Sequence, residues 1–197
     1  MADSRPALTL TKSQAARRER VIRAALELGA EGGYDAVQMR DVATRADVAL
    51  GTIYRYFPSK DAVLLAVMVQ WLGDLEGRVT RHPPVGGTTV ERIMDVLTRA
   101  LRAMDRDPRL TAAVIGAMTA GDPASVAAIN DVTRAMARIL QSAFPDEVDP
   151  ALEASAAKAL GHVWWSATIS WANGMGDVEW VAGELREAAE LIADRFG

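Results

Sequence analysis

The sequence contains no cysteine and only two histidines, and this scarcity excludes several kinds of site. Without thiols the chain forms neither a disulfide framework nor a thiolate metal centre. His82 and His162 lie far apart and have no carboxylate at a supportive spacing, so neither is expected to bind a metal or act as a base. The sequence also lacks a nucleophile with a paired base and a phosphate-binding loop. We therefore expect no metal, no cofactor and no catalytic residue.

Long hydrophobic runs are missing as well. No segment reaches the roughly 18 to 20 uninterrupted apolar residues of a membrane span, and the N-terminal residues lack the apolar core of a signal peptide. Half of the residues are nevertheless hydrophobic, and 197 residues are enough for a small domain and a larger one. We expect a cytoplasmic protein that buries a substantial core and has no membrane partner.

Strand signals are also absent, whereas apolar residues recur along the chain at the three- and four-residue spacing of helices. Turns that contain proline or glycine separate the helical segments. The expected fold is therefore all-α, with about nine helices. The predicted helices cover residues 13–32, 39–46, 51–57, 60–81, 88–105, 108–120, 123–144, 151–174 and 178–196.

Residues 33–60 combine two short helical patterns with a three-residue turn, which is the pattern of a helix-turn-helix motif. The turn is Asp47-Val48-Ala49, and Val48 is expected to pack between the two helices. The first helix has an apolar side that needs a partner. This apolar side consists of Met39, Val42, Ala43 and Ala46.

The second helix of the motif leaves two phenols and a guanidinium unburied. Ile53 and Phe57 lie four residues apart and face inward, so the residues between them point elsewhere, close to Gly51. Folding alone does not require such groups on a surface helix. They suit a recognition helix that presents hydrogen-bonding groups to base edges in the DNA major groove. The exposed set comprises Thr52, Tyr54, Arg55 and Tyr56.

Charge is distributed unevenly along the chain. The net charge is −4, yet residues 1–60 carry +3, which leaves −7 on residues 61–197. A basic end on an acidic body orients the molecule toward phosphate. The first predicted helix begins with a basic cluster that suits phosphate contacts, the alternative being a solvated charged face. This cluster consists of Lys12, Arg17, Arg18, Arg20 and Arg23.

The string Gly-Thr-Ile-Tyr-Arg-Tyr-Phe-Pro-Ser-Lys, preceded by Val-Ala-Thr-Arg-Ala-Asp-Val-Ala, resembles the signature of TetR-type transcriptional regulators. Two further strings are most similar to the KstR-type repressors of bacterial cholesterol catabolism within that family: Gly-Gly-Tyr-Asp-Ala-Val-Gln-Met-Arg and Arg-Ala-Met-Asp-Arg-Asp-Pro-Arg-Leu-Thr. The resemblance implies a helix-turn-helix domain over 1–60, with an N-terminal arm over about 1–12, and a ligand-binding and dimerisation domain over 61–197.

The same resemblance implies a repressor that binds palindromic double-stranded operator DNA as a homodimer and is released by a small hydrophobic effector. Similarity to the KstR type implies a steroid or fatty acyl group carried as a coenzyme A thioester. The family's DNA contacts fall here on Gln38, Arg40, Ala49, Leu50, Thr52, Tyr54, Tyr56 and Lys60, to which we add Arg17 from the basic cluster.

The last two helices carry apolar residues on two faces. On 151–174 the predicted core stripe is opposed by Trp165 and Ile169, and on 178–196 Trp180 and Leu191 lie away from the main stripe. We expect these four residues to form an interface between two copies, the alternative being that the tryptophans cover neighbouring loops. The predicted core stripe of 151–174 is Leu152, Ala156, Ala159, Leu160, Val163, Ala167 and Trp171.

Flexible thioethers and indoles are spread over the helices of the body, where they suit an adaptable apolar pocket, although methionine is also ordinary core filler. Four arginines of the segment 88–105 and its end lie opposite its apolar stripe, and we expect a solvated face there. These are Arg92, Arg99, Arg102 and Arg106. The candidate pocket residues are Trp71, Met94, Leu101, Met104, Met118, Met136 and Trp171.

Two other functions are consistent with parts of the sequence. A repressor of a drug-efflux gene would share the DNA-binding end and differ in the pocket, where buried carboxylates would favour a cationic compound. An all-helical enzyme or carrier for a hydrophobic substrate would need catalytic or carrier groups that the sequence does not display.

Overall fold

The computed structural model describes residues 11–121, 123–145 and 147–193. In this part of the chain all regular structure is helical, which confirms the predicted all-α fold, and the helix boundaries lie close to the predicted ones. The helices are α1 (Lys12–Ala36), α2 (Met39–Ala46), α3 (Leu50–Tyr56), α4 (Lys60–Arg81), α5 (Thr89–Asp105), α6 (Pro108–Thr119), α7 (Val126–Gln141), α8 (Pro150–Ala172) and α9 (Val178–Ala193), with a 3-10 turn, η1 (Pro123–Ser125). Residues 1–10 of the predicted arm lie outside the described residues.

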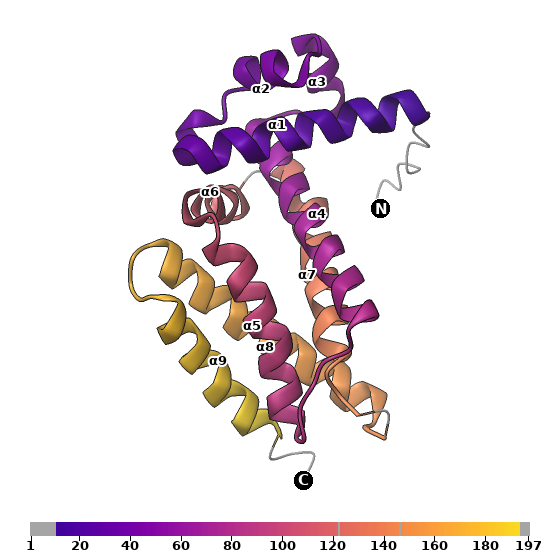
Figure 1. Ribbon diagram of the computed structural model, residues 1–197, viewed down its shortest axis with the longest axis vertical. Coiled ribbons are helices and arrows are strands. Elements are labelled where there is room, and N and C mark those ends of the chain that lie inside the picture. Colours follow the sequence, from indigo (N-terminus) through magenta and orange to yellow (C-terminus); the bar gives the residue numbers. More distant parts are fainter. Residues whose placement is uncertain (1–10, 122, 146, 194–197) are drawn as a thin grey trace.

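Helices α1, α2 and α3 form one end of the molecule, which we call the head. Figure 1 shows α1 lying across the top of the body, with α2 and α3 beyond it and α6 directly beneath it. Helix α4 leaves the head and runs the length of the body. There α4 packs on α6 and α7, α8 packs on α7 and α9, and α9 also packs on α5.

Local signals fix the ends of the helices that place the head. Thr11 and Gln14 form a reciprocal capping box at the start of α1. The regular helix is interrupted at Gly32 and Gly33, and Gly33 has a φ of +68°, a conformation that suits glycine. The Ser59 side chain accepts a hydrogen bond from the backbone N–H of Ala62 and caps α4. The stops and starts predicted at these places are confirmed.

The buried side of α8 differs from the predicted stripe. Leu152 and Ala159 are exposed, and Val163 and Trp171 are only partly buried. The buried face is instead rotated around the helix axis. Helix α8 packs against α6, α7 and α9 at once, and one narrow apolar stripe cannot contact all three helices. This face consists of Ala156, Ala157, Leu160, Trp164, Ala167 and Thr168.

Candidate nucleic-acid interface and effector cavities

Helix α3 presents its polar side chains on the outer surface of the head. Ile53 is fully buried and Phe57 almost so, as the four-residue spacing predicts. The Tyr54 side chain is 50% exposed and forms no hydrogen bond with any described residue. Arg55 lies over the ring of Tyr56, 5.2 Å from its centroid, and donates a 3.3 Å hydrogen bond to its hydroxyl. On α3 the phenol of Tyr54 is therefore free to contact DNA, whereas the phenol of Tyr56 is hydrogen-bonded to Arg55.

The turn between α2 and α3 is held by a residue of α1. Asp47 adopts a left-handed conformation, with φ at +51°. Arg20 donates hydrogen bonds from Nε to the carbonyl of Ala46, at 3.0 Å, and from its guanidinium to the carbonyl of Asp47, at 3.2 Å. Because these carbonyls lie at the end of α2, they lack helical partners, and Arg20 satisfies them.

The basic cluster at the start of α1 is thus divided between two roles. Arg18 lies over the ring of Phe57, 5.3 Å from its centroid, and burial lowers its pKa. Arg18 and Arg20 therefore contact residues of the helix-turn-helix motif itself. Arg17 hydrogen-bonds to the Ser13 hydroxyl at 3.0 Å, and Arg23 pairs with Glu19 on the surface, so these two remain near solvent.

The other predicted DNA contacts occupy different environments. Arg40 is exposed, and its guanidinium has no partner in the described chain. Gln38 is also exposed and donates to the carbonyl of Asp35. Ala49 caps α3, Leu50 begins it, and Thr52 is partly exposed. Lys60, at the start of α4, is partly exposed. Its Nζ lies 3.6 Å from the centroid of the Tyr34 ring and 3.4 Å from the Tyr34 carbonyl oxygen.

The head is joined to the body at α1. The Tyr34 hydroxyl donates a 2.7 Å hydrogen bond to Asp61 of α4. Burial, reinforced by this hydrogen bond to a carboxylate, raises the pKa of Tyr34 to about 12. From α6, Arg109 donates a 3.0 Å hydrogen bond to the carbonyl of Glu31. Beside it, Leu110 fits against Gly29, where a Cβ would lie 2.5 Å from the Leu110 Cδ1. The close contact between α1 and α6 therefore requires a glycine at position 29.

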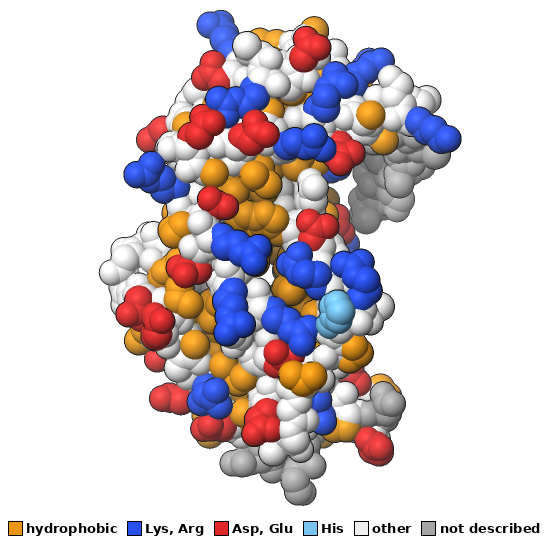
Figure 2. Space-filling view, viewed as in Figure 1, with side chains coloured by type: hydrophobic (Ala, Val, Ile, Leu, Met, Phe, Trp, Pro, Cys, Tyr) orange, Lys and Arg blue, Asp and Glu red, His pale blue; other side chains and the backbone are white. Residues whose placement is uncertain are grey.

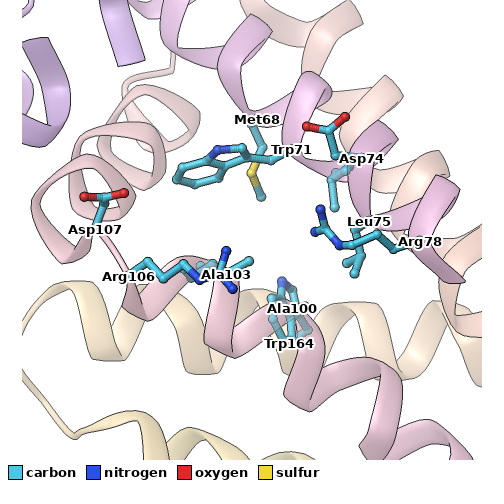
Figure 3. A pocket seen from close by; sticks show the side chains of 12 residues that line it. Met68, Trp71, Asp74, Leu75, Arg78, Ala100, Ala103, Arg106, Asp107 and Trp164 are labelled. Atoms are coloured by element: carbon cyan, nitrogen blue, oxygen red, sulfur yellow. The ribbon is translucent and has the colours of Figure 1, made fainter. Parts of the chain in front are cut away.

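Two of the cavities in the body contain residues that were predicted to line a pocket. The first, cavity A, has a volume of about 240 Å³ and lies between α4, the end of α5 and α8. Figure 3 shows the guanidinium groups of Arg78 and Arg106 pointing toward one another from opposite sides of its mouth, with Asp74 and Asp107 farther out. Its lining consists of Met68, Trp71, Leu72, Asp74, Leu75, Arg78, Ala100, Ala103, Met104, Arg106, Asp107 and Trp164.

The second, cavity B, has a volume of about 400 Å³ and lies between α4, α7 and α8. Its interior is apolar, and its outer edge carries the exposed residues Thr133, Lys158 and His162. The other lining residues are Met68, Leu72, Met118, Ile129, Val132, Met136, Ala137, Ala157, Gly161, Trp164 and Trp165.

The seven predicted pocket residues separate into three groups. Trp71 and Met104 line cavity A, and Met118 and Met136 line cavity B. Met94, Leu101 and Trp171 line neither cavity. Met94 and Leu101 are buried in the core because α5 packs its apolar side on α9, and Trp171 is partly buried against the same core.

The arginines of α5 do not form the uniform solvated face that was predicted. Arg99 donates to the carbonyls of His82 and Pro83, and Arg92 donates to the carbonyl of Ala143. Arg106 instead lies at the mouth of cavity A, opposite Arg78 from α4, and neither guanidinium has a partner among the described residues. Figure 2 shows Lys and Arg side chains gathered over α4 and α5 on this face.

The residues predicted to form an interface between two copies lie on α8 and α9. Leu191 is 74% exposed and Trp180 is also exposed. Trp165 and Ile169 are partly buried against the core, and Trp165 also lines cavity B. Within the described ranges no cluster of His, Asp or Glu side chains could hold a metal ion. No described helix has the length and hydropathy to cross a membrane.

Comparison with known proteins places these features in a family. The model of the tetR family of bacterial regulatory proteins matches residues 21–67, and the model of the tetracyclin repressor-like C-terminal domain matches residues 86–192. The HTH-type transcriptional repressor KstR of Rhodococcus jostii (strain RHA1) is 36% identical over 182 residues, which represent 92% of this chain and 85% of that protein.

Solved structures agree with this comparison over the whole fold. The crystal structure of a TetR transcriptional regulator from Rhodococcus sp. RHA1 has a TM-score of 0.82 and 32% identity, covering 92% of this chain and 97% of that one. Thermus thermophilus FadR, a TetR-family repressor crystallised with lauroyl-CoA, has a TM-score of 0.69 and 25% identity, covering 89% and 92%. The chain therefore belongs to the TetR family of bacterial regulatory proteins.

Proposed function

We propose that this protein is a repressor that binds palindromic operator DNA as a homodimer and leaves it when a coenzyme A thioester with an apolar acyl group binds in the body. A single short recognition helix reads few bases, so two copies on a two-fold axis are needed to read a palindrome. We assign the exposed faces of α8 and α9, with Trp180 and Leu191, to the contact between the copies.

One observation carries the choice of effector: cavity A has an apolar interior and an arginine-bearing mouth. Met68, Trp71 and Met104 offer apolar and polarisable surface, while Arg78 and Arg106 at the mouth have no partner among the described residues. Guanidinium groups bind phosphate oxygens with paired hydrogen bonds. A thioester of coenzyme A unites an apolar acyl group with phosphates, and it would place each against the matching part of the cavity. The FadR structure with lauroyl-CoA and the similarity to a KstR repressor support this class of effector.

A cationic effector fits this body less well. The buried polar side chains of the described chain are Thr111, Ser125 and Thr168, and no buried carboxylate is among them. A buried cation without a carboxylate partner would keep its full desolvation penalty. At the mouth of cavity A the two arginines would repel it, and only the exposed carboxylates of Asp74 and Asp107, which lie farther out, would attract it. The drug-sensing alternative therefore has no buried group that favours it.

The proposal is tested by fluorescence anisotropy on duplexes that tile the DNA upstream of the gene, at two salt concentrations, with and without fatty-acyl and steroid-acyl coenzyme A thioesters. We expect salt-sensitive binding to one palindromic segment and release by a thioester that remains chemically intact. The double variant Arg78→Gln/Arg106→Gln should need about tenfold more thioester for release, which is about 1.4 kcal/mol. Its affinity for DNA alone should not change.

The control is Arg102→Gln on α5, an exposed arginine that lines neither cavity. It should respond to thioester like the natural protein. Equal, weak binding to every duplex would rule out a sequence-reading repressor. Specific binding that no thioester relieves would rule out this effector class, and hydrolysis of the thioester would revive the enzyme alternative.

A further inference from the structure

Cavities A and B are separated by a shared wall. Three residues line both cavities: Met68 and Leu72 from α4, and Trp164 from α8. The Trp164 side chain is only 6% exposed, so it lies inside the body between the two spaces. Beyond this wall each cavity has its own lining, with Trp71 and Met104 on one side and Met118 and Met136 on the other.

The wall is made of side chains that can move. The Trp164 backbone carbonyl accepts a 2.8 Å hydrogen bond from the Thr168 hydroxyl, and this bond does not involve the indole ring, so displacing the ring leaves it intact. Met68 is unbranched and adapts its shape at low energetic cost. Gly161 lies one helical turn before Trp164 and lines cavity B, and a Cβ added there would meet nothing within 4 Å. Empty space is therefore available next to the indole.

The volumes favour a joined site. Pockets for drug-sized ligands usually span about 300 to 1,000 Å³. Cavity A, at about 240 Å³, falls below this range, and cavity B, at about 400 Å³, lies near its lower end. The two together would fall well inside it. The pair of arginines at the mouth of cavity A, which we propose binds phosphate, has no equivalent around cavity B.

We propose that cavities A and B are two halves of one elongated binding site, which a ligand joins by displacing the indole of Trp164. The ligand class is a coenzyme A thioester whose acyl group is long or polycyclic enough to pass the wall, while shorter acyl groups occupy cavity A alone. This inference rests on the proposed function for the position of the headgroup at Arg78 and Arg106. It adds that an effector needs an acyl group of a minimum length to bind at full affinity, and that Trp164 sets this length.

The test fills cavity B without touching cavity A. Gly161→Leu projects a side chain into cavity B from a helical position where the Cβ is accommodated. The matched control is Gly116→Leu on α6, where a Cβ also meets nothing within 4 Å and which lines neither cavity. Binding of butanoyl-, octanoyl-, lauroyl- and palmitoyl-CoA is measured by calorimetry on the protein alone, and release from the operator by anisotropy.

We expect Gly161→Leu to bind octanoyl-CoA within about twofold of the natural protein and palmitoyl-CoA about tenfold more weakly or worse. Gly116→Leu should match the natural protein for both. Trp164→Phe, which thins the wall, should bind palmitoyl-CoA more tightly and leave octanoyl-CoA unchanged. Trp171→Phe removes an indole outside both cavities and should change neither.

The possible failures are distinguishable. If Gly161→Leu leaves palmitoyl-CoA binding unchanged, or weakens every thioester by the same factor, the joined site is wrong even when thioesters release the DNA. If binding depends on chain length and on Gly161 but no thioester releases the DNA, the joined site holds and the proposed effector role is wrong. If calorimetry detects no thioester binding at all, both are wrong.

Discussion

The hydroxyl of Tyr34 donates a 2.7 Å hydrogen bond to the carboxylate of Asp61, and it thereby ties the end of α1 to the first turn of α4. The neighbouring Lys60 lies over the same ring. This joint lies between the DNA-reading head and the helix that lines both cavities. Lys60, which the family resemblance implies as a DNA contact, therefore also contacts the tyrosine that joins the head to the body.

Tyr34→Phe should lower the free energy of unfolding by about 1 kcal/mol, because it removes one partly exposed hydrogen bond to a carboxylate. Since folding raises the pKa of this phenol to about 12, the bond contributes in full below the ordinary tyrosine pKa of about 10 and is lost as the pH rises through about 12. Ultraviolet titration should show a tyrosine that ionises near pH 12, and this step should vanish in the variant. Its persistence in Tyr34→Phe would assign the step to another tyrosine.

Tyr54→Ala should weaken operator binding by about 1 to 3 kcal/mol, the range for a good contact to a base. The Tyr54 side chain is half exposed and has no described hydrogen-bond partner. The free energy of unfolding of the variant should therefore stay within about 0.5 kcal/mol of that of the natural protein. Anisotropy and calorimetric scanning on the same sample measure both effects. Undiminished operator affinity in a folded variant would remove Tyr54 from the DNA interface.

Arg20→Gln and Arg40→Gln should both weaken DNA binding, but with different salt dependence. Arg20 holds the turn through the carbonyls of Ala46 and Asp47, so its loss should misplace α3 and leave the slope of log affinity against log salt unchanged. Arg40 is exposed and free, and its loss should reduce that slope by about 1, as for one phosphate contact. A reduced slope for Arg20→Gln would show that Arg20 contacts phosphate instead.

Gly29→Ala should lower the free energy of unfolding by about 1 to 3 kcal/mol through overpacking, partly offset by the higher helix propensity of alanine, about 1 kcal/mol. The added methyl would overlap Leu110, which is fully buried and cannot swing into solvent. Leu110→Ala should therefore cost less in the Gly29→Ala background than alone, as urea unfolding of the double-mutant cycle would show. Strict additivity would mean that the two residues do not interfere.

The head was predictable from sequence because its signals are local. The four-residue spacing of Ile53 and Phe57 defines the buried side of α3, and Gly33 and Ser59 mark a helix end and a helix start. These effects act within one or two helical turns, so spacing alone reports them. The exposed phenol of Tyr54 follows from the same periodicity.

The cavities were not predictable to the same degree, because they combine residues from distant segments. Arg78 and Arg106 line the same cavity only because α4 packs beside α5. Trp164 was missed because α8 carries apolar residues around most of its circumference, so the choice of one stripe was arbitrary. The spacing of Ala157, Leu160, Gly161, Trp164 and Thr168 is also helical and would have indicated this second face.

The hydrogen bonds that Arg20 and Lys60 make within the protein could not be predicted from the sequence for a different reason. Both donate to backbone carbonyls, and every residue supplies a carbonyl, so the acceptor leaves no trace in the sequence. Basic residues near a DNA-binding motif therefore look alike until their neighbours are known.

Helix α4 contains 22 residues, so it is about 33 Å long, and it reaches from its Ser59 cap below the head to the mouth of cavity A. A rigid rod of that length acts as a lever: a tilt of about 5° would move its far end by about 3 Å. Hydrogen bonds to base edges tolerate only about 0.5 Å of displacement. An angular change too small to disturb the packing of the body would thus be enough to break the fit of the head to DNA, with no unfolding required.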